Sequence, residues 1–89
     1  MNGEKAEAAE VGAGQVEAVL AAEWQRVLKT TDTEPDADFF RLGGNSMDAV
    51  ELMTAVEERL GITFPLETLF MEGTFGALVR ACSELGATA

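Results

Sequence analysis

One serine stands at the point where an irregular segment gives way to a helical pattern. Ser46 follows the pair Gly43–Gly44 and Asn45, and a stretch with helical spacing begins with it. Serine is among the best residues for starting a helix, because its hydroxyl can accept a hydrogen bond from a free backbone N–H group. The same hydroxyl can instead be modified covalently, since a phosphate attached there would face the free N–H groups and the positive end of the helix dipole.

The composition excludes several kinds of active site. The chain has 89 residues, no histidine and a single cysteine, Cys82. Without histidine, neither a Ser–His nor a Cys–His nucleophile pair can be built. One cysteine allows neither an internal disulfide nor a Cys-x-x-Cys zinc site, and Cys82 is expected to be buried on the apolar side of a helix. A small enzyme is a weak alternative, because no paired carboxylates stand out for acid/base chemistry.

The net charge predicts which partners the chain avoids. Sixteen acidic residues against six basic ones give a formal charge of −10. Such a field repels nucleic-acid phosphates and anionic lipid surfaces, and it attracts partners with basic patches. No segment has the pattern of a signal peptide or the length of a transmembrane helix. We therefore expect a cytoplasmic monomer that binds neither nucleic acid nor membranes.

Apolar residues recur at helical spacing in three long segments and a short one. The pattern predicts helices from about 15 to 28, from 46 to about 60, over 66–70 and from 75 to about 85. Glu23 is the one charged residue in the apolar stripe of the first helix. Gly61 and Gly86 are expected to end the second and fourth helices, and Thr74 is expected to cap the fourth. The predicted inner stripe of the second helix consists of Ala49, Val50, Met53, Val56 and Leu60.

These elements predict an all-α fold, a small four-helix bundle with a short third helix and a long loop between helices 1 and 2. The loop spans residues 30–45, and its apolar residues Phe39, Phe40 and Leu42 are expected to hold it against the helices. A connection of this length in a compact domain is uncommon and often functional. The chain divides into an acidic, alanine-rich tail (1–13) that we expect to be disordered, one domain (14–86) and a short C-terminal tail (87–89).

Ser46 lies in a run that resembles the phosphopantetheine attachment motif of carrier proteins: Asp38-Phe39-Phe40-Arg41-Leu42-Gly43-Gly44-Asn45-Ser46-Met47. The Phe-Phe-x-Leu-Gly-Gly-x-Ser pattern is most similar to that of peptidyl carrier (thiolation) domains of nonribosomal peptide synthesis. Segments 60–70 and 74–78 are also similar to that family, so the resemblance covers about residues 15–85. Fatty-acid-type acyl carriers usually have Asp-Ser-Leu at the site, where this chain has Asn45-Ser46-Met47.

The resemblance implies that Ser46 carries a 4′-phosphopantetheine arm, transferred from coenzyme A by a separate phosphopantetheinyl transferase. The arm's thiol would hold an aminoacyl, peptidyl or acyl group as a thioester in nonribosomal peptide or hybrid natural-product biosynthesis. The carrier itself would be non-catalytic. An adenylation or other acyl-loading enzyme would load it, and condensation, ketosynthase or tailoring enzymes would act downstream. The residues flanking the attachment site would be Asp38, Gly43, Gly44, Asn45 and Met47.

The acidic face of the second helix has two interpretations. A charged face in solvent is the default for a surface helix, whereas the resemblance favours a docking face for basic patches on partner enzymes. The docking candidates are Met47, Asp48, Glu51 and Glu58. Two alternative functions stay open: a polyketide-type acyl carrier, and an unmodified acidic helical module for protein interaction. The start at Met1 and the end shortly after the fourth helix favour a free-standing carrier over an excised synthetase domain.

Three single residues carry further expectations. Trp24 is expected to pack in or beside the core. Asp38 either caps the loop or helps the transferase's metal-bound coenzyme A to approach. Gly73 takes the place of a proline that the family often has before Thr74, which predicts a more mobile loop after the third helix.

Overall fold

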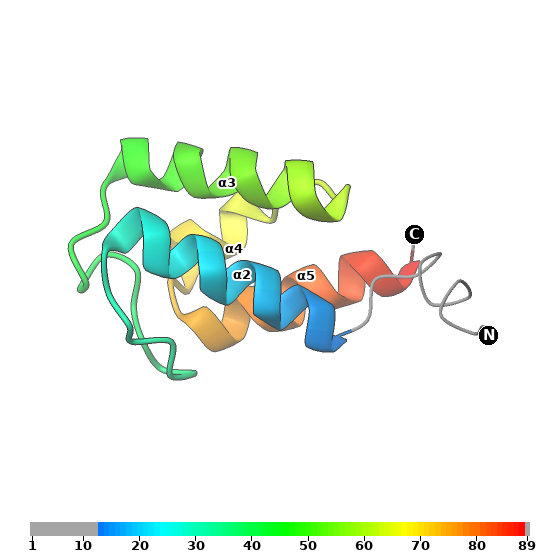
Figure 1. The fold of residues 1–89 in the computed structure, drawn as a ribbon, viewed down its shortest axis with the longest axis horizontal. Coiled ribbons are helices and arrows are strands. Elements are labelled where there is room, and N and C mark those ends of the chain that lie inside the picture. The colour runs from blue at the N-terminus through cyan, green and yellow to red at the C-terminus, as the bar shows by residue number, and fades with distance from the viewer. Residues whose placement is uncertain (1–12, 89) are drawn as a thin grey trace.

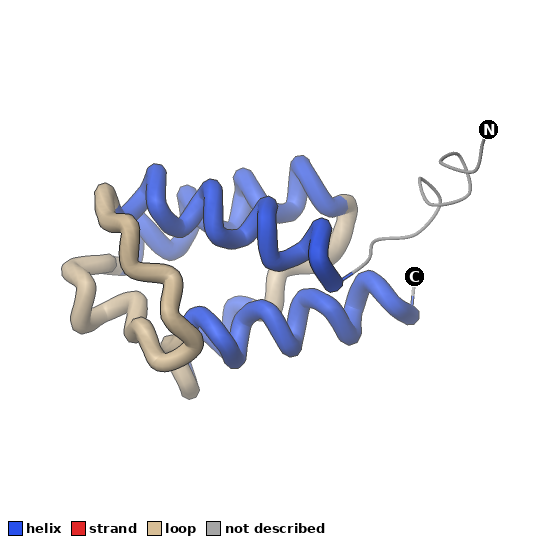
Figure 2. The backbone as a smooth tube through the Cα atoms, turned by 60° about the horizontal axis from the view of Figure 1, so that its bottom comes forward, coloured by secondary structure: helices blue, strands red, loops and turns tan. Residues whose placement is uncertain are grey.

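The computed structural model describes residues 13–88, which form four α-helices and, outside them, one isolated bridge between Asp38 and Thr74. The helices are α2 (Ala13–Leu28), α3 (Ser46–Leu60), α4 (Leu66–Met71) and α5 (Phe75–Thr88). The three long helices lie side by side, with α4 between α3 and α5 (Figure 1), and the long loop covers one end of the bundle (Figure 2). The predicted all-α bundle with a short third helix is confirmed. The predicted tail over residues 1–13 lies outside the described residues, except for Ala13, with which α2 begins.

The core is built around three aromatic rings. Trp24 contacts Phe39 of the loop and Phe75 of α5 edge-on, with ring centroids 5.6 and 5.2 Å apart. Such edge-to-face pairs add to the free energy gained by burial. The expected burial of Trp24 and Cys82 is confirmed, and burial raises the pKa of the Cys82 thiol to about 11. The largest fully buried side chains are Trp24, Phe39, Leu20, Leu52, Leu69, Leu78, Val16, Val56 and Cys82.

The buried stripe of α3 differs from the predicted one. The buried residues of this helix are Ala49, Leu52, Val56 and Leu60. The prediction is wrong for Val50, whose side chain is 52% exposed. Successive residues of an α-helix are turned by about 100°, so Val50 lies off the face that begins at Ala49. The prediction included Val50 and omitted Leu52, so it turned the stripe toward the side of Met53, which is partly buried against the core.

The last helix also departs from its predicted end. The prediction that Gly86 closes it is wrong, because α5 continues to Thr88. A glycine inside a helix costs about 1 kcal/mol relative to alanine, but it leaves the backbone hydrogen bonds in place. Gly61 does end α3 as predicted, with a left-handed φ of 69° and its N–H donated to the Glu57 carbonyl.

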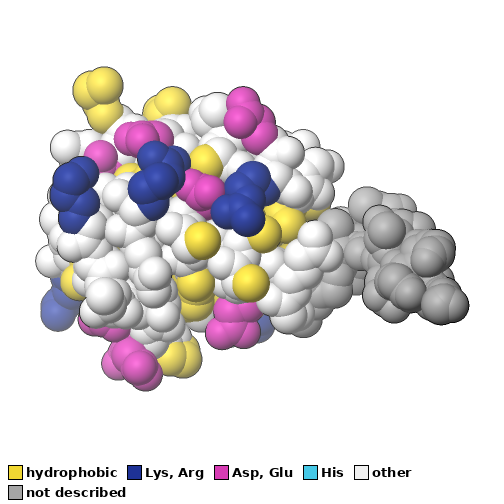
Figure 3. Space-filling view, in the orientation of Figure 1, with side chains coloured by type: hydrophobic (Ala, Val, Ile, Leu, Met, Phe, Trp, Pro, Cys, Tyr) yellow, Lys and Arg dark blue, Asp and Glu magenta, His cyan; other side chains and the backbone are white. Residues whose placement is uncertain are grey.

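A buried carboxylate joins α2 to α3. Glu23 accepts hydrogen bonds from Arg26 Nε at 2.8 Å and from Arg59 Nη1 at 2.9 Å, and Arg26 Nη1 also reaches Glu51 Oε2 at 3.0 Å. Burial by itself raises the pKa of the Glu23 carboxyl, but the hydrogen bonds and charges of the two arginines outweigh burial and lower it. Figure 3 shows basic and acidic side chains close together over α2 and α3. The charged residue in the apolar stripe therefore contributes a cross-link between helices.

Candidate functional site

Ser46 is the first residue of α3, and its side chain is exposed. The helix is capped by its neighbour: Asn45 Oδ1 accepts the Asp48 N–H at 2.9 Å, and the Asp48 carboxylate accepts the Asn45 N–H at 3.3 Å. This pair is a capping box, which satisfies two backbone donors at once. The interpretation of Ser46 as the helix cap is therefore wrong. Among residues 13–88 the Ser46 hydroxyl has no hydrogen-bond partner, so it is available for chemistry.

The two glycines before the serine are required for different reasons. Gly43 has a φ of 99°, in the left-handed region that L side chains rarely adopt. Gly44 lies against the fully buried ring of Phe39, and a Cβ on Gly44 would overlap that ring. The Gly44 N–H donates to the Phe39 carbonyl at 2.9 Å. The glycine pair thus lets the backbone pass over Phe39 and enter α3.

Asp38 holds the turn that leads to the serine. Its Oδ1 accepts the N–H groups of Phe40 at 2.9 Å and Arg41 at 3.1 Å, and its carbonyl accepts the Leu42 N–H at 3.0 Å. An aspartate that bonds the backbone two and three residues ahead is a local turn cap. This geometry supports the loop-capping role, and a role in the approach of coenzyme A stays a prediction.

The loop is fixed at its other side by the connection between α4 and α5. The Phe39 N–H donates to the Gly73 carbonyl at 2.8 Å, and the Phe75 N–H donates to the Ala37 carbonyl at 2.8 Å. The Trp24 indole N–H donates to the Asp32 carbonyl at 3.0 Å, nearer the start of the loop. Of the loop's aromatic pair, Phe39 is fully buried, as expected of an anchor. The mobility expected at Gly73 stays a prediction, although hydrogen bonds tie that connection to the loop.

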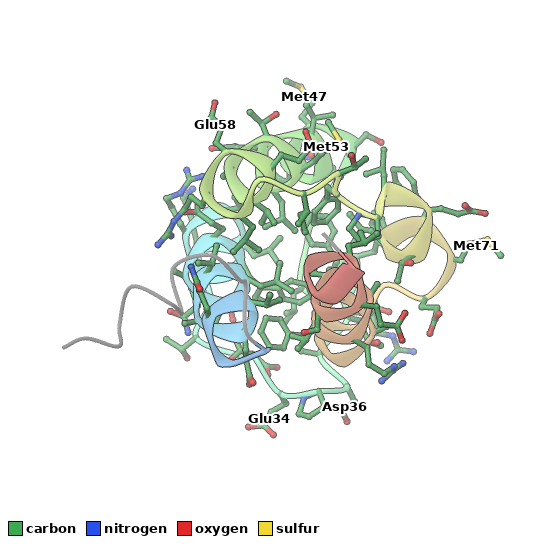
Figure 4. All side chains as sticks on the ribbon, turned by 90° about the vertical axis from the view of Figure 1, so that its right-hand side faces the viewer. Glu34, Asp36, Met47, Met53, Glu58 and Met71 are labelled. Carbon is green, nitrogen blue, oxygen red and sulfur yellow. The ribbon has the colours of Figure 1, made fainter. Side chains whose placement is uncertain are left out.

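Exposed apolar side chains lie on three segments: the first turns of α3, the loop before it and α4. Met47 is 80% exposed in the first turn of α3, and Figure 4 shows it pointing outward, as does Met71 at the end of α4. Phe40 of the loop stacks on Phe70 of α4, with centroids 5.9 Å apart and rings 18° from parallel. Both rings remain partly exposed, as does Val50. Of these side chains, the sequence predicts only Met47 as an exposed docking residue, because a helix as short as α4 has no reliable periodicity and the spacing places Val50 in the core.

The acidic docking candidates have different surroundings. Asp48 is engaged in the capping box, and Glu51 is paired with Arg26, whose side chain is 52% exposed. Glu58 is exposed, and Figure 4 places it with Met47 on the outer side of α3. The four candidates thus lie on one helix, with Glu51 in an exposed ion pair with Arg26.

The chain matches known proteins over most of its length. The family model described as "Phosphopantetheine attachment site" matches residues 18–82. Phosphinothricin tripeptide synthetase PhsC of Streptomyces viridochromogenes is 34% identical over 68 residues, and surfactin synthase subunit 1 of Bacillus subtilis is 38% identical over 66 residues. A hybrid PKS-NRPS synthetase, pydA of an Acremonium species, is 36% identical over 80 residues. These matches cover 76%, 74% and 84% of this chain but only 6%, 2% and 2% of the relatives.

A solved structure gives the same fold. It contains the phosphopantetheine transferase Sfp in complex with coenzyme A and a peptidyl carrier protein, and one of its chains superposes with a TM-score of 0.71 at 30% identity. The match covers 78% of this chain and 90% of that one. Within residues 13–88, no helix is long and apolar enough to span a membrane. From the matched family model, the fold and the exposed serine at the start of α3, we conclude that this chain belongs to the phosphopantetheine-attachment family of carrier domains.

Proposed function

We propose that Ser46 is the residue to which 4′-phosphopantetheine is attached, and that the chain is a non-catalytic cytoplasmic carrier. Its cargo is an aminoacyl, peptidyl or acyl group in nonribosomal peptide or hybrid natural-product biosynthesis. One observation carries the proposal: the Ser46 hydroxyl is exposed at the start of a long helix whose capping is performed by Asn45 and Asp48. The family and the synthetase relatives support the kind of group and pathway.

The residues around Ser46 suit a phosphodiester. In the attachment step, the Ser46 oxygen forms a bond to the phosphorus next to the pantetheine of coenzyme A, and the pyrophosphate bond breaks. Adenosine 3′,5′-bisphosphate leaves, and the hydroxyl proton passes to a base of the transferase. The N-terminus of α3 favours a negative charge on the attached phosphate. When bound, the group supplies a terminal thiol that holds the cargo as a thioester.

We propose that partners dock on the exposed face of α3 and on the adjoining loop and α4. Met47 supplies an apolar contact next to the serine, Glu58 supplies a negative charge, and Phe40 and Phe70 extend the apolar part. Charged rims mainly set the encounter rate and specificity, whereas buried apolar contacts supply most of the affinity. The expected partners are a phosphopantetheinyl transferase, an adenylation or acyl-loading enzyme, and condensation, ketosynthase or tailoring enzymes.

Intact-protein mass spectrometry after incubation with coenzyme A and a promiscuous phosphopantetheinyl transferase tests the attachment. We expect the wild type to gain the mass of one arm and Ser46→Ala to gain none. The chain's other serine, Ser83, has a buried hydroxyl and provides the matched control, because Ser83→Ala should be modified like the wild type. A wild-type protein that stays unmodified while a control carrier is loaded would favour the unmodified interaction module.

A polyketide-type acyl carrier is the second candidate, favoured by the match to a hybrid PKS-NRPS synthetase. The two candidates share the arm and differ in the loading enzyme. Incubation of the arm-bearing carrier with an adenylation enzyme, ATP and an amino acid, or with an acyltransferase and an activated acyl donor, would separate them by the mass of the thioester formed.

A further inference from the structure

We propose that Gly73 is a positioning residue for arm transfer. Through the carboxylate of Asp38, it sets the loop that presents Ser46 to the transferase. The inference rests on the proposed attachment at Ser46. It assigns a role in that reaction to a residue that follows α4 in the chain and lies outside the attachment motif.

The backbone of Gly73 fits this place only as glycine. Its φ is 73°, in the left-handed region, and it is buried. Its N–H donates to the Thr68 carbonyl at 3.2 Å, and its carbonyl accepts the Phe39 N–H at 2.8 Å. A Cβ at this position would lie 3.1 Å from Asp38 Oδ2 and would push against that carboxylate.

A continuous series of hydrogen bonds leads from that carboxylate to the attachment site. Asp38 Oδ1, the other oxygen of the same group, accepts the N–H groups of Phe40 and Arg41. The Phe39 carbonyl then accepts the N–H of Gly44, two residues before the attachment serine. A Cβ at Gly73 requires Asp38 Oδ2 to move by a few tenths of an ångström, which strains the two hydrogen bonds of Oδ1, so we expect the turn that enters α3 to shift. A misplacement of about 1 Å at a reacting group can cost up to about a hundredfold in rate.

The test compares two glycines with the same backbone conformation. Gly61 has a φ of 69°, close to that of Gly73, so alanine at either position meets similar backbone strain. A Cβ on Gly61 would have nothing within 4 Å, and Gly61 ends α3 at the end opposite Ser46. We expect Gly73→Ala to lower kcat for arm transfer by about tenfold, with KM for the carrier changed by less than about twofold. Gly61→Ala should keep wild-type values of both constants.

Two further measurements distinguish positioning from a loss of folding. Amide ¹H–¹⁵N chemical shifts of Phe40, Arg41 and Ser46 should move in free Gly73→Ala and stay in place in Gly61→Ala, while both variants show similar melting temperatures. In an Asp38→Ala background, which itself should have lowered kcat, Gly73→Ala should lower kcat no further, because its route of action is already gone.

The outcomes that overturn the inference are separate from those that overturn the attachment. Equal kcat for the two alanine variants, or additive losses in the double variant, would exclude action through Asp38. If Gly73→Ala does not fold, the test is Asp38→Ala alone. An unchanged kcat in Asp38→Ala would also exclude an effect of Gly73 through the Asp38 carboxylate. A wild type that is not loaded at all, beside a loaded control carrier, refutes the proposed function instead.

Discussion

The buried ion pair between α2 and α3 gives a prediction whose size follows from the structure. In Glu23→Gln, the side chain keeps its shape but loses its charge, and one of its two acceptor atoms becomes an NH₂ group that faces an arginine. Hydrogen bonds to charged groups contribute about 1.5–3 kcal/mol, against about 0.5–1.5 kcal/mol for neutral ones. The Arg26 and Arg59 side chains are 52% and 48% exposed and can return to water, which reduces the loss. We expect a cost of about 2 kcal/mol, or roughly 10 °C in Tm for a domain of this size.

Thermal unfolding followed by circular dichroism measures this cost. Glu17→Gln is the matched control, since Glu17 is an exposed glutamate of the same helix and its substitution should change Tm little. Glu51→Gln removes the exposed end of the network and should cost less than about 1 kcal/mol. If Glu23→Gln had the same Tm as Glu17→Gln, the reasoning would be refuted. That result would mean that the free-energy cost of burying the carboxylate cancels the gain from its bonds to the arginines.

The pH dependence has a defined sign. The pKa of Glu23 is lower in the folded protein than its ordinary value of 4.5, so the folded state binds the proton less tightly than the unfolded chain. The stability contributed by ionised Glu23 is therefore complete above pH 4.5 and is lost as the pH falls through the lowered pKa. The difference in Tm between wild type and Glu23→Gln should be constant at neutral pH and shrink below pH 4.5. A difference that grows on acidification would contradict the assigned direction.

Three further predictions concern the site and the core. Asn45→Ala removes the cap and should lower the free energy of unfolding, measured in urea, by about 1 kcal/mol, whereas Ser46→Ala should change it by less than about 0.5 kcal/mol. Equal losses in the two variants would mean that the serine shares the capping. Met47→Ala should raise the transferase KM with kcat unchanged, and Glu58→Gln should raise it only at low salt; a kcat effect of Met47→Ala would place that side chain in the chemistry instead. Cys82 should react slowly with iodoacetamide in the native protein and rapidly in denaturant, since its thiol is buried with a pKa of about 11; rapid native labelling would show that α5 opens.

The attachment motif could be predicted from the sequence because the backbone constraints on its glycines are local. Gly43 has a left-handed backbone, and a side chain at Gly44 would overlap Phe39. Both positions therefore require glycine, which is visible in the sequence. The cap was not readable, because serine and asparagine are both good helix caps and their choice depends on a register of one residue. The contact between Glu23 and Arg59 joins residues 36 positions apart, and no spacing rule within one helix could have predicted it.

The contacts that stabilise the fold around the attachment site are made by residues other than the serine. Asn45 and Asp48 hold the first turn of α3, Gly44 clears Phe39, and Asp38 holds the preceding turn. A hydroxyl with a structural duty would have to break a hydrogen bond before it could be esterified, and the protein would lose stability on every attachment. Because the serine has no such bond within residues 13–88, attachment should leave the melting temperature nearly unchanged. Substitutions of the surrounding residues should act in the opposite way, lowering stability or kcat while the serine stays modifiable. Comparing Tm before and after loading is therefore a direct measure of whether folding and chemistry are separated at this helix end.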